Sequence, residues 1–507
     1  MFKKLLSATL AVLMVFSLVL PAAATSEENP TIYVTGAQTN NLYNADGKLI
    51  YPFDIDIGGV TKAEIAACVA QFLAGCITGN YKEWADDLHE IIAPIFEEVK
   101  LDANGEASNG SHPEFHSSTV AVSNKQSGYG MWDYRFWYDW RLSPIETAEE
   151  LKNYIDRVTE ATGKNKVQLA GRCYGANVIQ AYITLYKDHA IEHVSDISYF
   201  ASSVMGIDFM SALFSGDIVL NDQAVSNFVD YYLESNEVIE DPITELLVVT
   251  LVELFNQAKV LGVGTDLIGK FFNEIKGDLL PVLLMDIVGS WPSYWSMVTP
   301  ELYTKSIDFI FKNNKEEYAK FIEKTDKYYY EVEVNAEDII LELEDKGINF
   351  YMFTKYGFPE FPLYAGSTIQ SDSYTSVPRQ SFGATSADYG KVLDQKYIDS
   401  LTDKKYLSPD FKVDASTALL PERSWFVKNL HHNYFEVLHV IALEAMRYDL
   451  TVDNDKYPQY LYHENDIVTP LVGADEDATK APSNLFTSII RFFTALFNFI
   501  AKLFKGK

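Results

Sequence analysis

Short apolar runs alternate with amphipathic stretches along roughly the first 200 residues. Runs rich in β-branched and aromatic residues predict buried strands at about 32–34, 136–141 and 167–170. Helical spacing of apolar positions separates these runs, over about 61–99, 143–162 and 177–185. Because strands and helices alternate at short spacing, the pattern predicts parallel βαβ units and an α/β fold.

The pattern changes between residues 205 and 330, which are mostly helical in spacing and rich in Leu, Phe, Val and Trp. Charged residues interrupt the apolar runs of this region, so none reaches the ~18 residues of a membrane-spanning helix. We therefore expect an inserted helical cap. Strand signals resume at 348–353, where the α/β pattern continues.

The N-terminal residues have the three parts of a secretory signal peptide. Two lysines precede an apolar run over 5–20, and three alanines at 22–24 precede a polar segment. An N-terminal membrane anchor is the alternative interpretation of the same run. The signal-peptide pattern predicts cleavage after Ala24 and an exported protein, either secreted or held in a bacterial cell envelope.

The C-terminal residues carry a second targeting feature. Residues 484–507 have a wide apolar face with lysines near its end, which predicts an amphipathic helix. Such a helix would contact a membrane surface, or it would pack on the domain or on a second copy of the chain. The chain thus divides into a signal peptide (1–24), the first part of the core (25–204), the cap insertion (205–330), the second part of the core (331–473), an acidic linker (474–483) and the amphipathic helix (484–507).

Composition and charge narrow the classes of function. Of the 507 residues, 48% are hydrophobic and 14% aromatic, which excludes a disordered chain. The net charge of −30 argues against a nucleic-acid partner, because phosphate contacts need Lys and Arg surfaces. Three cysteines are too few for a disulfide-stapled scaffold. Cys68 and Cys76, eight residues apart on one predicted helix, are separated by ~12 Å of rise, too far for a disulfide.

The pentapeptide Gly171-Arg172-Cys173-Tyr174-Gly175 lies between a predicted strand and a predicted helix. Hydrolases of the α/β type place G-x-S-x-G at such a turn, where small neighbours permit a tight, strained backbone. A cysteine suits this place, because a helix N-terminus lowers the thiol pKa and favours the reactive thiolate. Cys173 is therefore the candidate nucleophile, and a structural cysteine on a glycine-rich turn is the alternative.

A nucleophilic cysteine needs a base and usually an acid that orients the base, in the chain order nucleophile, acid, histidine. His431 and His432 follow a strand-like run at 424–427, on a loop that leads into a helix. A catalytic histidine belongs on such a loop. His439 lies in an apolar run and is interpreted as a core histidine.

The acid and the oxyanion hole are expected on neighbouring loops. Asp372 follows the strand predicted at 348–353, whereas its competitor Asp466 comes after the favoured histidines in the chain. Acyl transfer also needs amide donors for the developing oxyanion. We expect the amides of Tyr174 and Ala37, with Gln38 as the second choice on the loop after the first strand.

Three further segments carry a resemblance to a known family. The segments are Thr31-Ile32-Tyr33-Val34-Thr35-Gly36 with Leu49-Ile50-Tyr51-Pro52, then Tyr138-Asp139-Trp140-Arg141, and Trp291-Pro292-Ser293-Tyr294-Trp295 with Pro300. They are similar, in that order, to the opening strand and oxyanion loop, the Y-D-W-R segment and the cap segment of the lecithin:cholesterol acyltransferase-like group of α/β-hydrolase lipases. The resemblance extends over about 30–434.

This resemblance implies an α/β-hydrolase fold, a mostly parallel sheet flanked by helices with an inserted helical cap. It implies Cys173 as nucleophile, Asp372 as acid and His432, in preference to His431, as the histidine. The chain departs from the family in having cysteine for serine, and serine for the glycine that usually follows the acid. The disulfide that some relatives have near the lipid interface is not possible with these cysteines.

The resemblance also implies a lipid or other acyl-ester substrate, hydrolysed or transferred through a thioester acyl-enzyme. A non-catalytic hydrolase-fold envelope protein that binds lipid or a protein partner is the alternative. No histidine/carboxylate cluster with ligand spacing stands out along the chain. We therefore expect no metal and no organic cofactor.

Overall fold

The computed structural model describes residues 28–52, 62–122, 131–221, 223–224, 227–228, 231, 253–254, 256–361 and 369–473. The predicted signal peptide (1–24), acidic linker (474–483) and amphipathic helix (484–507) lie outside the described residues, and the predicted cap (205–330) is described in part.

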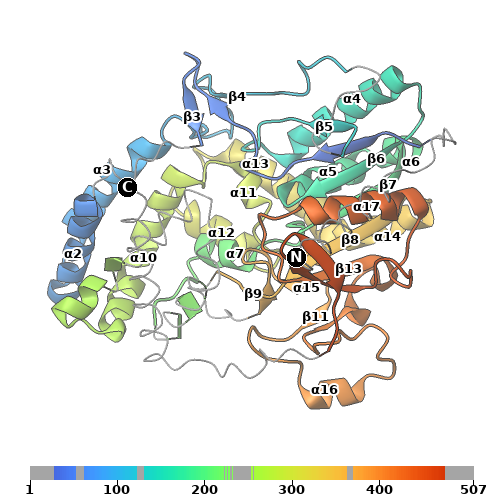
Figure 1. The fold of residues 1–507 in the computed structure, drawn as a ribbon. Coiled ribbons are helices and arrows are strands. Elements are labelled where there is room, and N and C mark those ends of the chain that lie inside the picture. Colours follow the sequence, from blue (N-terminus) through green and yellow to red (C-terminus); the bar gives the residue numbers. More distant parts are fainter. Residues whose placement is uncertain are drawn as a thin grey trace, which may run out of the picture.

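A mostly parallel sheet forms the centre of the described chain (Figure 1). Its strands lie in the order β15-β14-β13-β8-β7-β6-β1-β5, and only β15 runs antiparallel to its neighbour. The strands are β1 (Thr31–Val34), β5 (Tyr134–Phe136), β6 (Val167–Arg172), β7 (Val194–Phe200), β8 (Asn349–Tyr356), β13 (Ser424–Lys428), β14 (Tyr460–Glu464) and β15 (Ile467–Pro470). The strands predicted at 32–34, 167–170, 348–353 and 424–427 are confirmed.

Helices cover both faces of the sheet. Successive side chains of a strand point to opposite faces, so apolar residues of one strand pack against helices on both sides. Ile32 and Leu169 belong to the hydrophobic cluster shared with α4 and α5, whereas Tyr33 and Ala170 belong to the cluster shared with α17. The flanking helices are α4 (Pro144–Thr162), α5 (Tyr174–Leu185), α6 (Lys187–His193), α14 (Ala336–Asp345) and α17 (Glu436–Tyr448).

Helix α4 illustrates how local sequence sets an element's ends. The Ser143 side chain caps the helix by accepting a hydrogen bond from the Ile145 amide, and Pro144 occupies the first turn. Gly163 ends the helix in the left-handed conformation, at φ 67°. The helix predicted over 143–162 is thereby confirmed.

A second helical group lies between β7 and β8 in the chain. It contains α7 (Asp208–Phe214), α10 (Thr265–Ile287), α11 (Pro292–Trp295), α12 (Tyr303–Ile310) and α13 (Ala319–Lys327). Two earlier helices, α2 (Lys62–Thr78) and α3 (Lys82–Phe96), pack against α10, with the rings of Phe72 and Phe271 5.4 Å apart (Figure 1). Helices that we assigned to the first part of the core thus lie beside those assigned to the cap.

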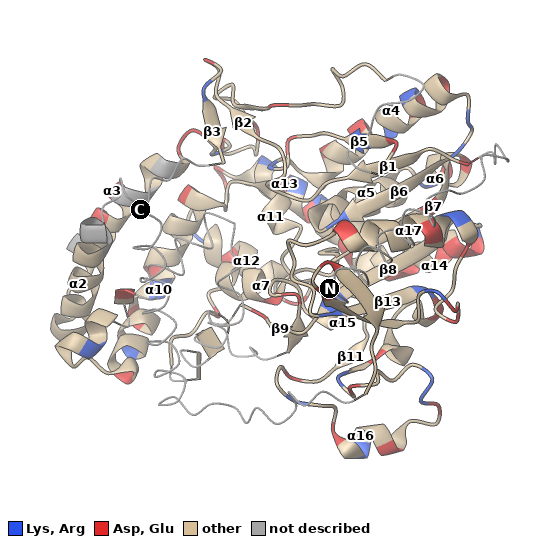
Figure 2. Ribbon diagram, in the orientation of Figure 1, with Lys and Arg blue, Asp and Glu red and all other residues tan. Residues whose placement is uncertain are grey.

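The remaining elements of the described chain are short. They are β2 (Leu42–Tyr43), β3 (Leu49–Tyr51), β4 (His112–Pro113), η1 (Tyr328–Val332), η2 (Glu333–Asn335), β9 (Phe358–Pro359), β10 (Gln370–Ser371), α15 (Val377–Gln380), β11 (Thr385–Ser386), α16 (Gln395–Ser400), β12 (Val413–Asp414), η3 (Ala415–Thr417) and η4 (Pro421–Arg423). None of the helices in the described part of the chain combines the length and apolar character needed to cross a membrane. Acidic and basic residues are interspersed over the described part of the chain (Figure 2).

Candidate active site

The turn between β6 and α5 holds Cys173 in a conformation that is rare for a residue with a side chain. Its φ is 49° and its ψ −123°, and its amide donates to the Phe200 carbonyl over 2.9 Å. A Cβ added to Gly171 would lie 2.9 Å from the Ala176 nitrogen, and one added to Gly175 only 2.3 Å from the Val34 carbonyl oxygen. The glycines therefore permit the close approach that keeps this turn strained.

Three side chains from three strand ends meet at this turn. His432, on the loop after β13, places Nδ1 2.7 Å from Oδ2 of Asp372, which directly follows the short strand β10. The His432 amide also donates to the Asp372 carbonyl over 2.9 Å, and the amides of Tyr374 and Thr375 donate to Asp372 Oδ1. The His432 ring shares a hydrogen bond with the Cys173 thiol. The structure thus brings together the three residues that we proposed as nucleophile, acid and base.

The groups around Cys173 and His432 favour transfer of the thiol proton to the imidazole. Burial would raise the pKa of the Cys173 thiol, but His432, Arg172 and the Tyr174 amide outweigh it and hold that pKa below its ordinary value. Burial would lower the pKa of His432, but Asp372 and Cys173 raise it above its ordinary value. The geometry therefore favours thiolate and imidazolium, the form in which a cysteine nucleophile is reactive.

The other two cysteines differ from Cys173 in their position and in their surroundings. Cys68 and Cys76 both lie on α2, and all three cysteines are free. Burial raises the pKa of Cys68, and it raises the pKa of Cys76 to about 11. The prediction that these two form no disulfide is confirmed, and neither lies in surroundings that favour a thiolate.

A buried lysine that the sequence analysis did not single out supports the histidine loop. Lys355 Nζ donates to the carbonyls of His431, His432 and Tyr434 over 3.1, 2.7 and 3.1 Å. Burial holds the pKa of Lys355 well below its ordinary value, while Asp372 opposes that shift. A lysine inside the apolar strand 349–356 was the signal available in the sequence, because a buried lysine needs partners.

The alternative residues have other surroundings. Burial lowers the pKa of His431 to about 3, and its ring lies edge-on to Phe358. His439 packs among the rings of Tyr33, Trp132 and Phe200, as expected of a core histidine. Asp466 lies in the exposed turn between β14 and β15. Among the alternatives considered for acid and base, only Asp372 and His432 are paired with each other.

The expected oxyanion hole has one donor in contact with the thiol. The Tyr174 amide hydrogen-bonds the Cys173 thiol. A Cβ added to Gly36 would lie 3.2 Å from Cys173 Cβ, so the loop that carries Ala37 passes directly against the nucleophile. Gln38, next on this loop, has φ 61° and donates from Nε2 to the Tyr294 hydroxyl over 2.6 Å.

The first-strand loop, 35–40, is tied to the segment 138–141. The Tyr138 hydroxyl donates to the Thr35 carbonyl, and Trp140 Nε1 donates to the Asn40 carbonyl over 2.9 Å. Arg141, which is fully buried, forms an ion pair with Asp139 at 2.6 Å. This segment therefore holds the loop beside Cys173.

The cap segment 291–295 packs on the same segment. The rings of Trp140 and Trp291 lie edge to face, 5.1 Å apart, and the Ser293 amide donates to the Arg141 carbonyl over 3.3 Å. The Tyr51 ring meets Trp140 at 5.0 Å. The three segments that carried the resemblance are thus neighbours in space.

A second histidine–carboxylate group lies away from Cys173. Asp156, His189 and His193 place one ligand atom each within 4.8 Å of one another. The sequence analysis did not single out this group, because Asp156 is 33 residues from His189 and the packing of α4 on α6 brings them together.

Comparisons with known proteins agree with this architecture. Residues 126–337 match the family model described as lecithin:cholesterol acyltransferase, a stretch of less than half the chain. It includes Cys173 and the segments 138–141 and 291–295, whereas Asp372 and His432 lie beyond it. No curated protein matches the sequence.

A solved structure, "The crystal structure of Tle4-Tli4 complex", is 16% identical over 37% of this chain and 48% of its own, with a TM-score of 0.18. This chain therefore spans less than half the length of that one, and we draw nothing from the likeness. The family match and the mostly parallel sheet flanked by helices fit a lipase or acyltransferase of the α/β-hydrolase type. The chain has an α/β-hydrolase fold, the fold class predicted from its sequence.

Proposed function

We propose that this protein is an acyl hydrolase or acyltransferase of the lecithin:cholesterol acyltransferase-like type, with Cys173 in place of the usual serine. The observation that carries the proposal is the contact of Cys173, on its strained turn, with His432, which Asp372 orients through a 2.7 Å hydrogen bond. The family match supports the reaction class. The lowered pKa of Cys173 supports thiolate chemistry.

The reaction takes two steps. The Cys173 thiolate attacks the acyl carbonyl carbon, and the amides of Tyr174 and Ala37 stabilise the oxyanion. The alkoxide then leaves with a proton from His432, and a thioester remains on Cys173. In the second step His432 takes a proton from water or an alcohol, which attacks the thioester and releases an acid or a new ester. The thiolate is thereby regenerated.

The substrate side of the proposal rests on the family match and on the aromatic cap segment. The Tyr294 hydroxyl accepts a hydrogen bond from Gln38, on the loop that carries Ala37, and the Tyr294 ring packs on Trp291. The cap segment therefore adjoins the loop beside Cys173, where we propose that a lipid or other acyl ester binds. We also propose export through residues 1–24. A membrane-surface contact through residues 484–507 is a further proposal, based on their sequence alone.

Trapping of the acyl-enzyme tests this proposal. The full chain is mixed with p-nitrophenyl esters and thioesters of increasing chain length, quenched in acid and digested for mass spectrometry. We expect an acyl group on the peptide that contains Cys173 and none on the peptides with Cys68 or Cys76. Full turnover by the Cys173→Ala variant would exclude the proposed nucleophile.

Iodoacetamide provides a second test that needs no substrate. We expect Cys173 to react much faster than Cys68 or Cys76, and the His432→Ala variant to slow its reaction. Equal, slow labelling of all three thiols, together with no turnover of any ester, would support the non-catalytic alternative, a hydrolase-fold protein that binds lipid or a protein partner.

A further inference from the structure

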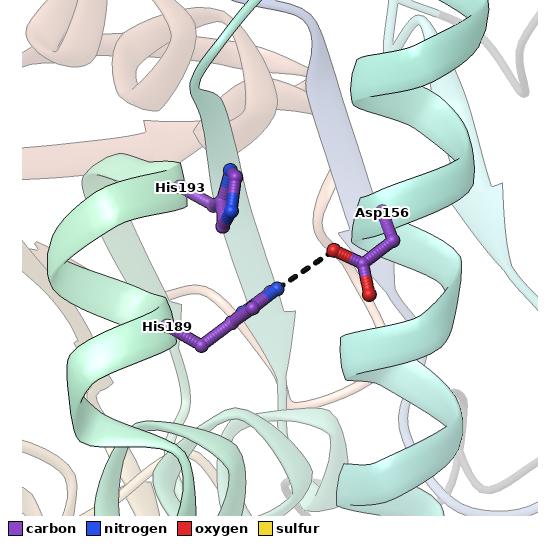
Figure 3. Close-up of side chains that lie close together, drawn as sticks. All are labelled: Asp156, His189 and His193. Carbon is purple, nitrogen blue, oxygen red and sulfur yellow. Dashed lines mark hydrogen bonds and ion pairs between the residues drawn. The ribbon is translucent and has the colours of Figure 1, made fainter.

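Three side chains from two helices converge on one another (Figure 3). They lie where α6 leads into β7, at the end of that strand opposite to the Cys173 turn. Asp156 projects from α4, and His189 and His193, one helical turn apart, project from α6. His189 Nε2 lies 2.8 Å from Asp156 Oδ1, and the two imidazole rings have centroids 4.4 Å apart. All three side chains are partly buried, so a small ion from solvent has access to them.

Both imidazoles are held through Nδ1 by groups outside the cluster. His189 Nδ1 lies 2.8 Å from the hydroxyl of Tyr182, a fully buried residue. His193 Nδ1 lies 3.0 Å from the Asn165 carbonyl oxygen, which fixes the ring hydrogen on Nδ1 because a carbonyl only accepts. Histidines that bind metals are held in this way, with one nitrogen on an outer partner and the other on the ion. The Nε2 atoms are thus the ones that face the cluster, and an ion there would replace the hydrogen bond between His189 Nε2 and Asp156 Oδ1.

The carboxylate is oriented in the same manner. Asp156 Oδ2 accepts from Lys152 Nζ over 3.0 Å, which leaves Oδ1 toward His189. The Glu192 carboxylate lies 4.0 Å from His193 Nε2.

We propose that Asp156, His189 and His193 form a divalent transition-metal site, for which Zn²⁺ is the best match. Two imidazole nitrogens and one carboxylate oxygen with an open fourth position suit zinc, whereas Ca²⁺ and Mg²⁺ prefer oxygen ligands throughout. Ligands of a tetrahedral zinc lie about 3.3 Å from one another. Atoms already within 4.8 Å reach that spacing through small side-chain rotations.

The position of the cluster points to a structural role. His193 ends α6, and Val194 begins β7, so the site lies at the amino end of a strand whose carboxyl end carries Phe200. At that opposite end the Phe200 carbonyl accepts a hydrogen bond from the Cys173 amide. A zinc ion here would join α4 to α6 and hold the start of β7, without touching the reacting atoms.

The test is zinc binding by the full, tag-free chain, measured by equilibrium dialysis and calorimetry. The Cys173→Ala background is used throughout, because a thiolate beside His432 could also hold zinc. We expect one Zn²⁺ per chain and a higher unfolding temperature with zinc. His193→Ala and Asp156→Asn should each weaken binding by at least about 100-fold, and Tyr182→Phe by about 10-fold, the low end of the range for outer partners.

The matched control is His112→Ala, which removes an exposed histidine far from the cluster in the chain and should leave zinc affinity unchanged. Cobalt in place of zinc should give the intense visible absorption of a four-coordinate ion, without the near-ultraviolet band of a thiolate ligand. Absence of a stoichiometric zinc ion would overturn the proposal. So would equal binding by the His189→Ala/His193→Ala double variant, provided that its circular dichroism matches that of the parent.

Discussion

Two histidine–aspartate pairs in this molecule have nearly the same hydrogen-bond length, and the pKa values of their histidines shift in opposite directions. His432 lies 2.7 Å from Asp372, and His189 lies 2.8 Å from Asp156. The pKa of His432 is raised above its ordinary value, whereas that of His189 is lowered. A hydrogen bond to a carboxylate therefore does not by itself decide which protonation state a histidine adopts.

The opposite pKa shifts of the two histidines arise from the groups that neighbour each one besides its aspartate. Burial opposes the charged form of both imidazoles. At His432 the Cys173 thiol adds a second group that favours imidazolium, while at His189 the neighbours His193 and Lys152 oppose it. One pair is thus built to carry a proton beside an anion, and the other to offer a neutral nitrogen.

The strongest way to separate the two pairs is to remove the nucleophile. We expect Cys173→Ala to lower kcat for a p-nitrophenyl ester by about 10⁶-fold, as for other covalent nucleophiles. His189→Ala should leave kcat unchanged, because His189 lies at the far end of the sheet from Cys173. A comparable loss of kcat in both variants would contradict the division of roles.

Neutralising each aspartate sharpens the comparison. Asp372→Asn should lower kcat by about 10⁴-fold, because the amide favours the wrong histidine tautomer. Asp156→Asn, a substitution of the same size, should change kcat less than about 2-fold and act on zinc affinity instead. Initial rates with matched circular dichroism spectra check both, and the roles would be reversed if Asp156→Asn were the more damaging change.

Lys355 tests how far the support of the catalytic histidine extends. Lys355→Met removes the donor to the carbonyls of His431, His432 and Tyr434. We expect kcat to fall by about 10–10²-fold with little change in KM, because displacement of a catalytic group by about an ångström costs about that much. Lys355→Arg should restore part of the rate. If the Met and Arg variants have the same kcat and the same unfolding temperature as each other, the lysine has a purely structural role.

The pH dependence of alkylation compares the three thiols directly. The rate at Cys173 should rise with pH through a midpoint below the ordinary thiol value of 9.0, because its folded pKa is lowered. The rate at Cys76 should rise only near pH 11. Asp372→Asn should move the Cys173 midpoint upward, since the imidazolium beside the thiolate is then less favoured. An unchanged midpoint would mean that the acid does not act through His432.

The smallest expected effect concerns stability in mild acid. The folded pKa of His189 is lowered, so between that pKa and 6.5 the unfolded chain binds more protons than the folded one. Stability contributed at this site should therefore fall as the pH drops below 6.5, and His189→Gln should flatten that dependence. Urea unfolding at several pH values, without zinc and with His112→Gln as control, measures the change. An identical slope in both variants would contradict the lowered pKa.

Local signals predicted much of the fold and of the candidate site. The β-branched strands, the Ser143 cap and the Gly171–Gly175 turn are set by residues close in sequence. Chain order favoured Asp372 over Asp466, and the family resemblance favoured His432 over His431. Features that depend on tertiary packing were missed.

The missed features share one physical cause. The helix spacing of 62–96 is the same whether those helices flank the sheet or pack on α10. In the sequence, Lys355 is a single polar position in an apolar strand. Its three carbonyl partners become its neighbours only in the folded protein. Asp156 and His193 have no visible relation until α4 meets α6. Contacts between distant segments carry this information, and no periodicity records it.

The backbone at Cys173 sets a limit on how stable this protein can become. A φ of 49° and a ψ of −123° fall outside the regions that residues with a side chain normally adopt, which costs on the order of 1–3 kcal/mol. Glycine would carry that conformation at less cost but would remove the thiol. Selection for thermal robustness alone would therefore lead toward an inert Gly at this position, so reactivity and robustness are in direct competition at a single residue.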